Sequence, residues 1–442
     1  MLKLKLRIFH YSRIYYEKFS NIAQRVQRQI HNILYKTERS HYFYIWLSIL
    51  TSLAVLGAYG LASSFFISLE ILEFNIDIPW AMMISTYVFF VVSSTGLCIV
   101  TSLGHVFGRR DYELIGKRGV FLAIITIMFG MLAIMLHLGH PERSFFFYLT
   151  PNIGSAIWGM SFFYTFYILF IMIEYWLLAR AELAYTANTS TGWKQVLYGL
   201  ALFGIRDESH TAVDRDHRFA KWAGIAAMAA GLSAHSTLGA IFGHAESMPY
   251  WYGAYYPIYF LLSATFSGFA WMIAVVIITY RIQKKEMSHE LKELVLEMGN
   301  ALVILLGVGM LFTLYKITSG VFHPVKAKTI MLFLNGPFSI PFYTFELAVG
   351  TVFPALLLLY SLKRQWMTGL MIASIMALVG LFFMRYDFVV AGQIYPIFNN
   401  IPLPATVVPT LMEIFVIAGI FGGLLLVYTL AVKFLPLEEK EQ

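Results

Sequence analysis

The chain has 442 residues, of which 59% are hydrophobic and 13% are charged, and its formal net charge is +7. Soluble domains are about 45–50% apolar and about 25% charged, so this composition excludes a soluble enzyme, a disordered chain and a fibrous repeat. It indicates an integral membrane protein, in which the positive charges are expected to lie mainly on one side of the bilayer.

The first 42 residues form a basic segment with nine lysine and arginine residues. It contains no apolar run long enough for a cleavable signal peptide. Phe19, Ile22, Val26, Ile30 and Ile33 recur at helical spacing. This spacing predicts an amphipathic helix lying on the anionic inner leaflet, and a flexible basic tail is the alternative.

A membrane-spanning helix needs about 20 mostly apolar residues. We therefore predict an all-α integral membrane protein with about ten transmembrane helices in bundles. Residues 43–435 would form the membrane domain and residues 436–442 a C-terminal tail. The ten apolar stretches are 43–67, 79–104, 119–139, 155–179, 219–243, 252–280, 294–319, 341–362, 366–391 and 407–432.

The distribution of positive charge predicts the topology. With the N-terminus inside and the spans alternating, the inner segments carry 27 of the 32 lysine and arginine residues, and the outer loops carry three. The positive-inside rule then places both termini in the cytoplasm and the protein in the inner membrane. The inner segment 180–220 is polar and has no span of its own, so we expect a loop of variable structure there.

Ionisable groups within spans are costly and mark either a function or a buried pair. The predicted topology and a rise of about 1.5 Å per residue give the depth of each group. Glu174 and Glu297 fall near the inner face, whereas seven groups fall in the outer half. A polar site near the extracytoplasmic surface is therefore expected, covered by aromatic loops. The seven groups are His137, His235, Lys316, Glu346, Arg385, Asp387 and Glu413.

His235 lies on a face of small residues, since Ala227, Gly231, Gly239 and Gly243 precede and follow it at intervals of four. Small residues allow a neighbouring helix to approach closely. We therefore expect His235 to point into the bundle, either as a packing residue or as a catalytic or ligand-binding group.

Arg385 and Asp387 are two residues apart, so they point to different sides of a regular helix. Arg385 therefore needs another partner, and Glu413 lies at a matching depth. The sequence predicts an Arg385–Glu413 ion pair, which is either structural or able to handle protons.

A polar site at one face, with aromatic walls and access from the bilayer, suits a quinone. Quinone reduction takes two electrons and two protons, which a histidine and carboxylates can supply or remove. The one cysteine excludes an iron–sulfur cluster held by this chain alone, because common clusters need four cysteines or two cysteines and two histidines. The electrons must then come from a partner at the outer face.

Four motifs in this order resemble those of the NrfD/PsrC family, the membrane subunits of polysulfide reductase-like complexes. His137 to Arg143, followed by Pro151 and Asn152, resembles the LGxPxR…NP signature. His235 to Gly239 resembles the HxSxLG motif of the ten-helix branch that includes HybB, DsrP and HmcC. Met384-Arg385-Tyr386 with Asp387, and Pro409 to Glu413, also resemble that branch. The resemblance covers roughly residues 43–435.

This resemblance implies the quinone-binding subunit of a multi-subunit respiratory oxidoreductase, with menaquinone or ubiquinone as substrate and no haem or iron–sulfur cluster of its own. The implied partners are a periplasmic ferredoxin-like iron–sulfur subunit and a catalytic or multihaem cytochrome subunit. Nucleic acid is not expected as a partner.

The resemblance also implies a role for each site residue. His235 would donate a proton or a hydrogen bond to the quinone carbonyl, and Arg385, Asp387 and Glu413 would carry or tune protons. His137, His140, Arg143 and Tyr386 would line the quinone site, its mouth or the partner interface.

Two other functions compete with this interpretation. A b-type cytochrome needs two facing histidines at one depth, which His137 and His235 could provide for a single haem. A secondary transporter often has helices broken by glycine or proline around a site at the midplane. Here the charges lie near one face and no clear pair of broken helices is found.

Overall fold

The computed structural model describes residues 41–66, 78–138, 140–396 and 409–438, and every regular element in these ranges is helical. Ten helices are long and apolar enough to cross a membrane, which confirms the predicted number of spans. The basic segment lies outside the described residues, apart from its last two. The spans are α2 (His41–Phe66), α3 (Met82–His105), α4 (Arg110–His137), α6 (Ala156–Thr189), α8 (His210–Gly243), α9 (Tyr255–Gln283), α10 (His289–Val321), the π-helix η3 (Pro341–Val352) continued by α12 (Phe353–Arg364), α13 (Met367–Ala391) and α14 (Leu411–Phe434).

Helix α3 lies at the centre of the bundle and is buried along most of its length. It packs on α4, α8, α9 and α13. Gly96 of α3 faces Gly268 of α9, and a Cβ atom built at Gly96 would lie 1.9 Å from the carbonyl oxygen of Ala264. Since lipid provides no hydrophobic driving force between helices, close backbone contact at small residues holds such a pair together.

Hydrogen bonds between distant segments define the two ends of the bundle. Trp46 at the start of α2 donates to Thr429 near the end of α14, with an N–O distance of 3.1 Å. Tyr198 of the short helix α7 (Trp193–Ala201) donates to the backbone oxygen of Phe434 at 2.6 Å. The start of α2, the end of α14 and α7 therefore share one end of the bundle, which we call the α7 end.

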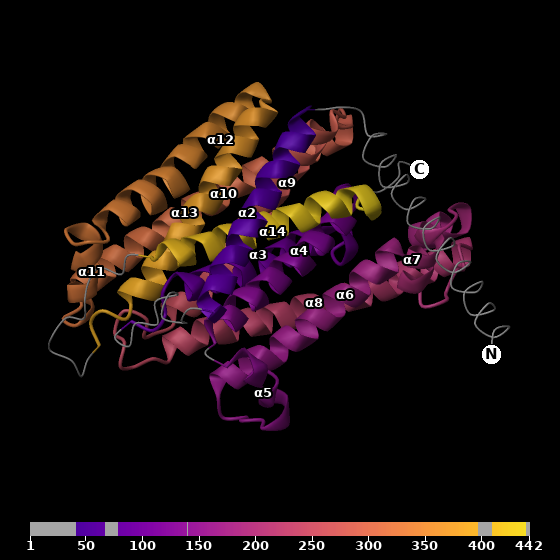
Figure 1. The fold of residues 1–442 in the computed structure, drawn as a ribbon. Helices are drawn as coiled ribbons and strands as arrows, with labels where there is room; N and C mark the ends of the chain where they lie inside the picture. The colour runs from indigo at the N-terminus through magenta and orange to yellow at the C-terminus, as the bar shows by residue number, and fades with distance from the viewer. Residues whose placement is uncertain (1–40, 67–77, 139, 397–408, 439–442) are drawn as a thin grey trace, which may run out of the picture.

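At the opposite end, Trp251 between α8 and α9 donates to the backbone oxygen of Phe388 in α13 at 2.8 Å. This end also carries η2 (Pro141–Arg143), α5 (Phe146–Leu149) and α11 (Lys326–Leu334). We call it the α11 end, and Figure 1 shows α11 and α7 at opposite ends of the bundle.

Helices α6 and α8 extend beyond the other helices at the α7 end. Each has 34 residues and is about 51 Å long at 1.5 Å per residue, whereas the hydrocarbon core is about 30 Å thick. The prediction of a loop of variable structure over 180–220 was wrong, because α6 continues to Thr189, α7 follows, and α8 begins at His210.

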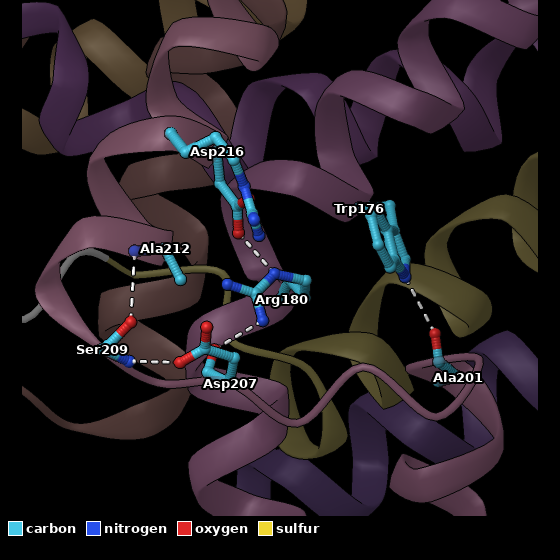
Figure 2. Close-up of polar contacts among 8 residues, drawn as sticks. Trp176, Arg180, Ala201, Asp207, Ser209, Ala212 and Asp216 are labelled. Carbon is cyan, nitrogen blue, oxygen red and sulfur yellow. Dashed lines mark hydrogen bonds and ion pairs between the residues drawn. The ribbon is translucent and has the colours of Figure 1, made fainter.

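Polar contacts hold this extension together (Figure 2). Arg180 of α6 donates to the carboxylate of Asp216 in α8 and, at 2.6 Å, to the backbone oxygen of Asp207. Asp207 accepts a hydrogen bond from the Ser209 N–H at 2.9 Å, and hydrogen bonds from Ser209 hold the pKa of Asp207 below its ordinary value. The hydroxyl of Ser209 in turn caps α8 at Ala212. The capping and the buried ion pair turn the predicted loop into ordered helix.

We expect Gly96→Ala to destabilise the bundle, because its Cβ atom would meet the backbone of α9 and force α3 away from it. Overpacking of this kind costs about 1–3 kcal/mol. The matched control is Gly307→Ala in α10, where a Cβ atom would meet nothing within 4 Å. Thermal unfolding of the detergent-solubilised protein measures the difference. Equal stability of the two variants would contradict the close α3–α9 contact.

Candidate functional site

A buried ion pair lies toward the α11 end of the bundle. The ammonium of Lys316 in α10 is 3.1 Å from Oε1 of Glu346 in η3, and the two residues are 9% and 5% exposed. The ammonium also lies 5.6 Å from the ring centroids of Phe333 and Phe342. Because buried charges are stable only when they are paired, these contacts hold the lysine charged inside an apolar bundle.

Glu346 lies in a π-helical segment, a form often found at functional sites. Proline stands at the start of this segment and again at Pro354, just after its end. The second carboxylate oxygen of Glu346 is buried and has no hydrogen-bond partner among the described residues. A buried oxygen of this kind is normally satisfied by water or by a ligand.

Asp387 adds a second carboxylate to the same region. It is 1% exposed, and neither of its carboxylate oxygens has a hydrogen-bond partner in the described part of the chain. Its carboxylate interacts electrostatically with Glu346 and Lys316. Three ionisable side chains from α10, η3 and α13 therefore form one buried cluster, which we call the acid–lysine cluster.

Arg385 and His235 meet on the ring of Phe260 in α9. The guanidinium of Arg385 lies 4.2 Å from the centroid of this ring, and it donates to the hydroxyl of Ser263. The imidazole of His235 has its centroid 5.9 Å from the same ring. Both residues are 0% exposed, so the prediction that His235 points into the bundle is confirmed.

The predicted Arg385–Glu413 ion pair was wrong. Arg385 instead contacts the hydroxyl of Ser263 and the face of Phe260, a combination that stabilises a cation without a carboxylate. Glu413 is buried on α14, which packs mainly on α2 and also on α4. The backbone N–H of Glu413 donates to the hydroxyl of Thr410 at an N–O distance of 3.1 Å, which caps the start of α14.

Of the remaining motif residues, Tyr386 borders the acid–lysine cluster, and the three residues near the end of α4 are in a separate part of the chain. His137 is the last residue of α4, and His140 and Arg143 are exposed in the connection to α6. His140 Nδ1 lies 2.9 Å from Glu142, and hydrogen bonds from the backbone and from His140 lower the pKa of Glu142. Tyr386 of α13 is partly buried, with its ring 6.3 Å from that of Phe338.

A pocket of about 610 Å³ lies beside the acid–lysine cluster, between α9, α10 and α11. Lys316 is part of its wall. On another side it is bordered by Ile258, Leu311 and Tyr315, which are 57%, 64% and 62% exposed and therefore face the surrounding lipid. The pocket thus connects the bilayer with the buried lysine. Its other lining residues include Tyr250, Tyr255, Tyr256, Phe312, Lys326 and Ile330.

The tyrosines give this pocket flat walls and hydrogen-bond donors. Tyr255 stacks on Tyr259 and on Tyr315, with centroid distances of 5.4 and 6.1 Å. Burial raises the pKa of Tyr250 to about 12, so its phenol stays protonated at neutral pH. At the rim, Lys326 donates to the backbone oxygen of Tyr252 at 2.7 Å, and partial burial lowers the pKa of Lys326.

The aromatic loops expected from the sequence to cover the site are residues 145–148 and 250–256, the second of which runs into the predicted span 252–280, and Ser263 does not stand out. The structure places Tyr250, Tyr255 and Tyr256 in the pocket wall. The spacing of these residues could have indicated the wall. Tyr255 and Tyr259 are one helical turn apart and share a helix face, and so do Phe312 and Lys316 on α10.

The fold and the site define a multi-pass helical membrane protein with a buried ionisable cluster near one end. The family model for the polysulphide reductase NrfD matches residues 70–397. The chain belongs to this family, as the sequence motifs predicted.

Three curated proteins are similar over most of the chain. A selenate reductase subunit of Mesobacillus selenatarsenatis is 26% identical over 416 residues, which are 90% of this chain and 95% of that protein. A putative dimethyl sulfoxide reductase membrane subunit of Halobacterium salinarum is 24% identical, covering 89% and 91%. The integral membrane subunit of an Hdr-like menaquinol oxidoreductase of Archaeoglobus fulgidus is 23% identical, covering 80% of each chain.

We expect Lys316→Met and Glu346→Met each to destabilise the protein strongly, because each leaves one buried charge without its partner. Such a loss costs about 3–5 kcal/mol, whereas replacing both partners by apolar residues is close to neutral. The double variant should therefore be more stable than either single variant in thermal unfolding.

The control for these single and double variants is Arg109→Met, which removes an exposed ion pair. The side chains of Arg109 and its partner Glu297 are 51% and 44% exposed. An exposed pair contributes about 0–1 kcal/mol, so this change should have little effect. Single variants as stable as the double variant would refute a buried ion pair.

Proposed function

We propose that this chain is the quinone-binding membrane subunit of a multi-subunit respiratory oxidoreductase, with the quinone site in the pocket between α9, α10 and α11. The observation that carries the proposal is the pocket itself, which joins the lipid-facing surface to the buried Lys316–Glu346 pair. The names of the relatives, which include a menaquinol oxidoreductase subunit and two reductase subunits, support the same class.

The residues of the pocket suit a quinone. The quinone ring is flat and apolar and carries two carbonyl oxygens, which require hydrogen-bond donors. The stacked tyrosines provide flat walls, and the phenol of Tyr250 and the ammonium of Lys316 provide donors. The pocket volume of about 610 Å³ lies within the ordinary range of about 300–1,000 Å³ for ligand sites. The isoprenoid tail would leave past Ile258 and Leu311 into the bilayer.

The quinone takes up two electrons and two protons when it is reduced and releases them when it is oxidised. In our proposal Lys316 exchanges a proton with one carbonyl oxygen, and Glu346 stabilises the charged form of the lysine. Asp387, with two unsatisfied oxygens, holds a proton within the same cluster. When Lys316 gives up its proton, Glu346 is left without its charged partner, so a proton must return to the pair, and Asp387 is its proposed source.

His235 and Arg385 are buried deeper in the bundle than the residues that line the pocket. Arg385 interacts electrostatically with Tyr259 and Glu346, so its positive charge acts on the Lys316–Glu346 pair beside the pocket. His235, whose ring also contacts Phe260, is proposed to exchange protons with these groups. We assign Glu413 no step at the pocket, because it lies on α14 and no described residue of α14 lines the pocket.

The electrons must come from or go to a partner subunit. We propose that it carries iron–sulfur clusters or haem and docks at the α11 end, where His140 and Arg143 are exposed. The positive-inside rule supports an extracytoplasmic position for this end. With the α7 end in the cytoplasm, 27 of the 32 lysine and arginine residues lie on the cytoplasmic side.

Cysteine labelling tests this orientation. The native Cys98 is buried, so it contributes little background. We expect a membrane-impermeant maleimide to label Asn152→Cys at the α11 end in intact cells. Thr191→Cys at the α7 end should react only after the membrane is opened. Labelling in the reverse order would overturn the proposed topology.

Quinone binding is tested with the complex purified with its partners. Lys316→Met should lower labelling by a photoreactive menaquinone analogue and quinone-coupled turnover by at least tenfold, because the pocket loses its charged donor. The matched control is Lys328→Met, an exposed lysine on α11. Since Lys316→Met also removes a buried charge, the Lys316→Met/Glu346→Met double variant serves as the folded comparison.

His235→Ala should abolish quinone-coupled turnover while the complex still assembles. Normal turnover in this variant would remove His235 from the proposed site. A stoichiometric haem signal in a pyridine haemochrome assay of the purified chain would instead favour a b-type cytochrome.

A further inference from the structure

A second and larger cavity lies in the other half of the bundle. It has a volume of about 900 Å³ and is bordered by α2, α9, α13 and α14 toward the α7 end. Most of the residues that line it are aliphatic or aromatic. It shares no lining residue with the pocket between α9, α10 and α11, so it is a separate site.

This cavity exists because of how the helices pair. Helix α2 packs closely on α14, where Gly57 faces Gly419, and a Cβ atom at Gly57 would lie 2.5 Å from the Cα atom of Gly419. Helix α2 makes little contact with α9, while α13 packs on α9 and η3. The α2–α14 pair and the α9–α13 pair are therefore separated, and an apolar space lies between them.

The shape and the walls of the cavity fit hydrocarbon chains. Its deep end is formed by the aromatic rings of Phe89, Phe382 and Phe421, with centroid distances of 5.6 and 5.7 Å from Phe89 to the other two. On the side, Ile375 and Val379 are each 38% exposed and face the lipid. An acyl chain can therefore enter sideways from the bilayer and fill the space.

The mouth of the cavity is basic. Lys284 and Lys285 directly follow α9, and Lys433 lies in the last turn of α14. None of the described residues lining the cavity is acidic. Lys285 also lies 3.7 Å from Glu438, and Glu286 directly follows Lys285 in the chain. Within the described lining itself, the three lysines are not matched by a carboxylate.

The mouth also lies at the depth of lipid headgroups. The three lysines stand at helix ends, and Tyr44 and Trp46 of the first turns of α2 border the same opening. Tyrosine and tryptophan concentrate at the membrane–water interface, and lysines extend their ammonium groups toward it. A phosphate group at this level would meet the ammonium groups while its acyl chains lie among the aromatic rings.

We propose that this cavity binds one anionic phospholipid from the leaflet at the α7 end, with its acyl chains between α2, α9, α13 and α14 and its phosphate at Lys284, Lys285 and Lys433. The basic mouth favours an anionic lipid over a neutral lipid and over a quinone, whose headgroup is uncharged.

Native mass spectrometry of the complex purified with its partners tests this proposal, with phosphatidylglycerol and phosphatidylcholine as probes. We expect the wild-type complex to retain phosphatidylglycerol with a preference of about tenfold. Combined replacement of Lys284, Lys285 and Lys433 by Gln should remove the preference. The matched control replaces Lys221, Lys292 and Lys363 by Gln, which makes the same charge change away from the cavity and should keep the preference.

A second variant tests the acyl-chain site without changing charge. Val379→Trp fills the lipid-facing wall of the cavity and should lower the retention of both lipids, while thermal unfolding checks that the protein is intact. The proposal is overturned if the wild-type complex binds both lipids equally or if the two lysine triple variants behave alike. Crosslinking of the photoreactive menaquinone analogue to residues of this cavity would also overturn it.

Discussion

The buried contact between Lys316 and Glu346 is the interaction on which the arrangement of the α11 end depends. An ammonium and a carboxylate that leave water together must be paired and further stabilised, because the apolar interior screens them little. The aromatic rings of Phe333 and Phe342 and the π-helical turn around Glu346 meet this requirement. Oxygens of Glu346 and Asp387 remain unsatisfied at the same place, which supports the proton exchange that we propose for this region.

Close packing at small residues positions this cluster. Gly96 and Gly268 bring α3 and α9 into backbone contact, and Gly239 of α8 approaches Pro257 of α9. These contacts place Phe260 of α9 between His235 and Arg385. The charged and aromatic groups of four helices thus converge because the helices between them carry no bulky side chains at these contacts.

The two ends of the molecule serve different physical purposes. At the α11 end, polar groups are buried and partly unsatisfied, as expected where substrates or protons are handled. At the α7 end, Arg180 and Asp216 form a buried pair that fixes the extension of α6 and α8 (Figure 2). There the Arg180–Asp216 pair stabilises the fold, and among the described residues buried atoms of His105 and Glu174 are unsatisfied in this half as well.

The ten spans, the family and the burial of Glu346, Arg385 and Asp387 could be predicted from the amino-acid sequence. Apolar run length and the cost of burying charge are local properties that each segment carries alone. Which residues meet depends on the tertiary structure. Arg385 pairs with Ser263 because α13 packs on α9, whereas α14, which carries Glu413, packs mainly on α2. Helix capping and the Arg180–Asp216 pair likewise order residues 180–220, because these contacts join segments that hydropathy treats separately.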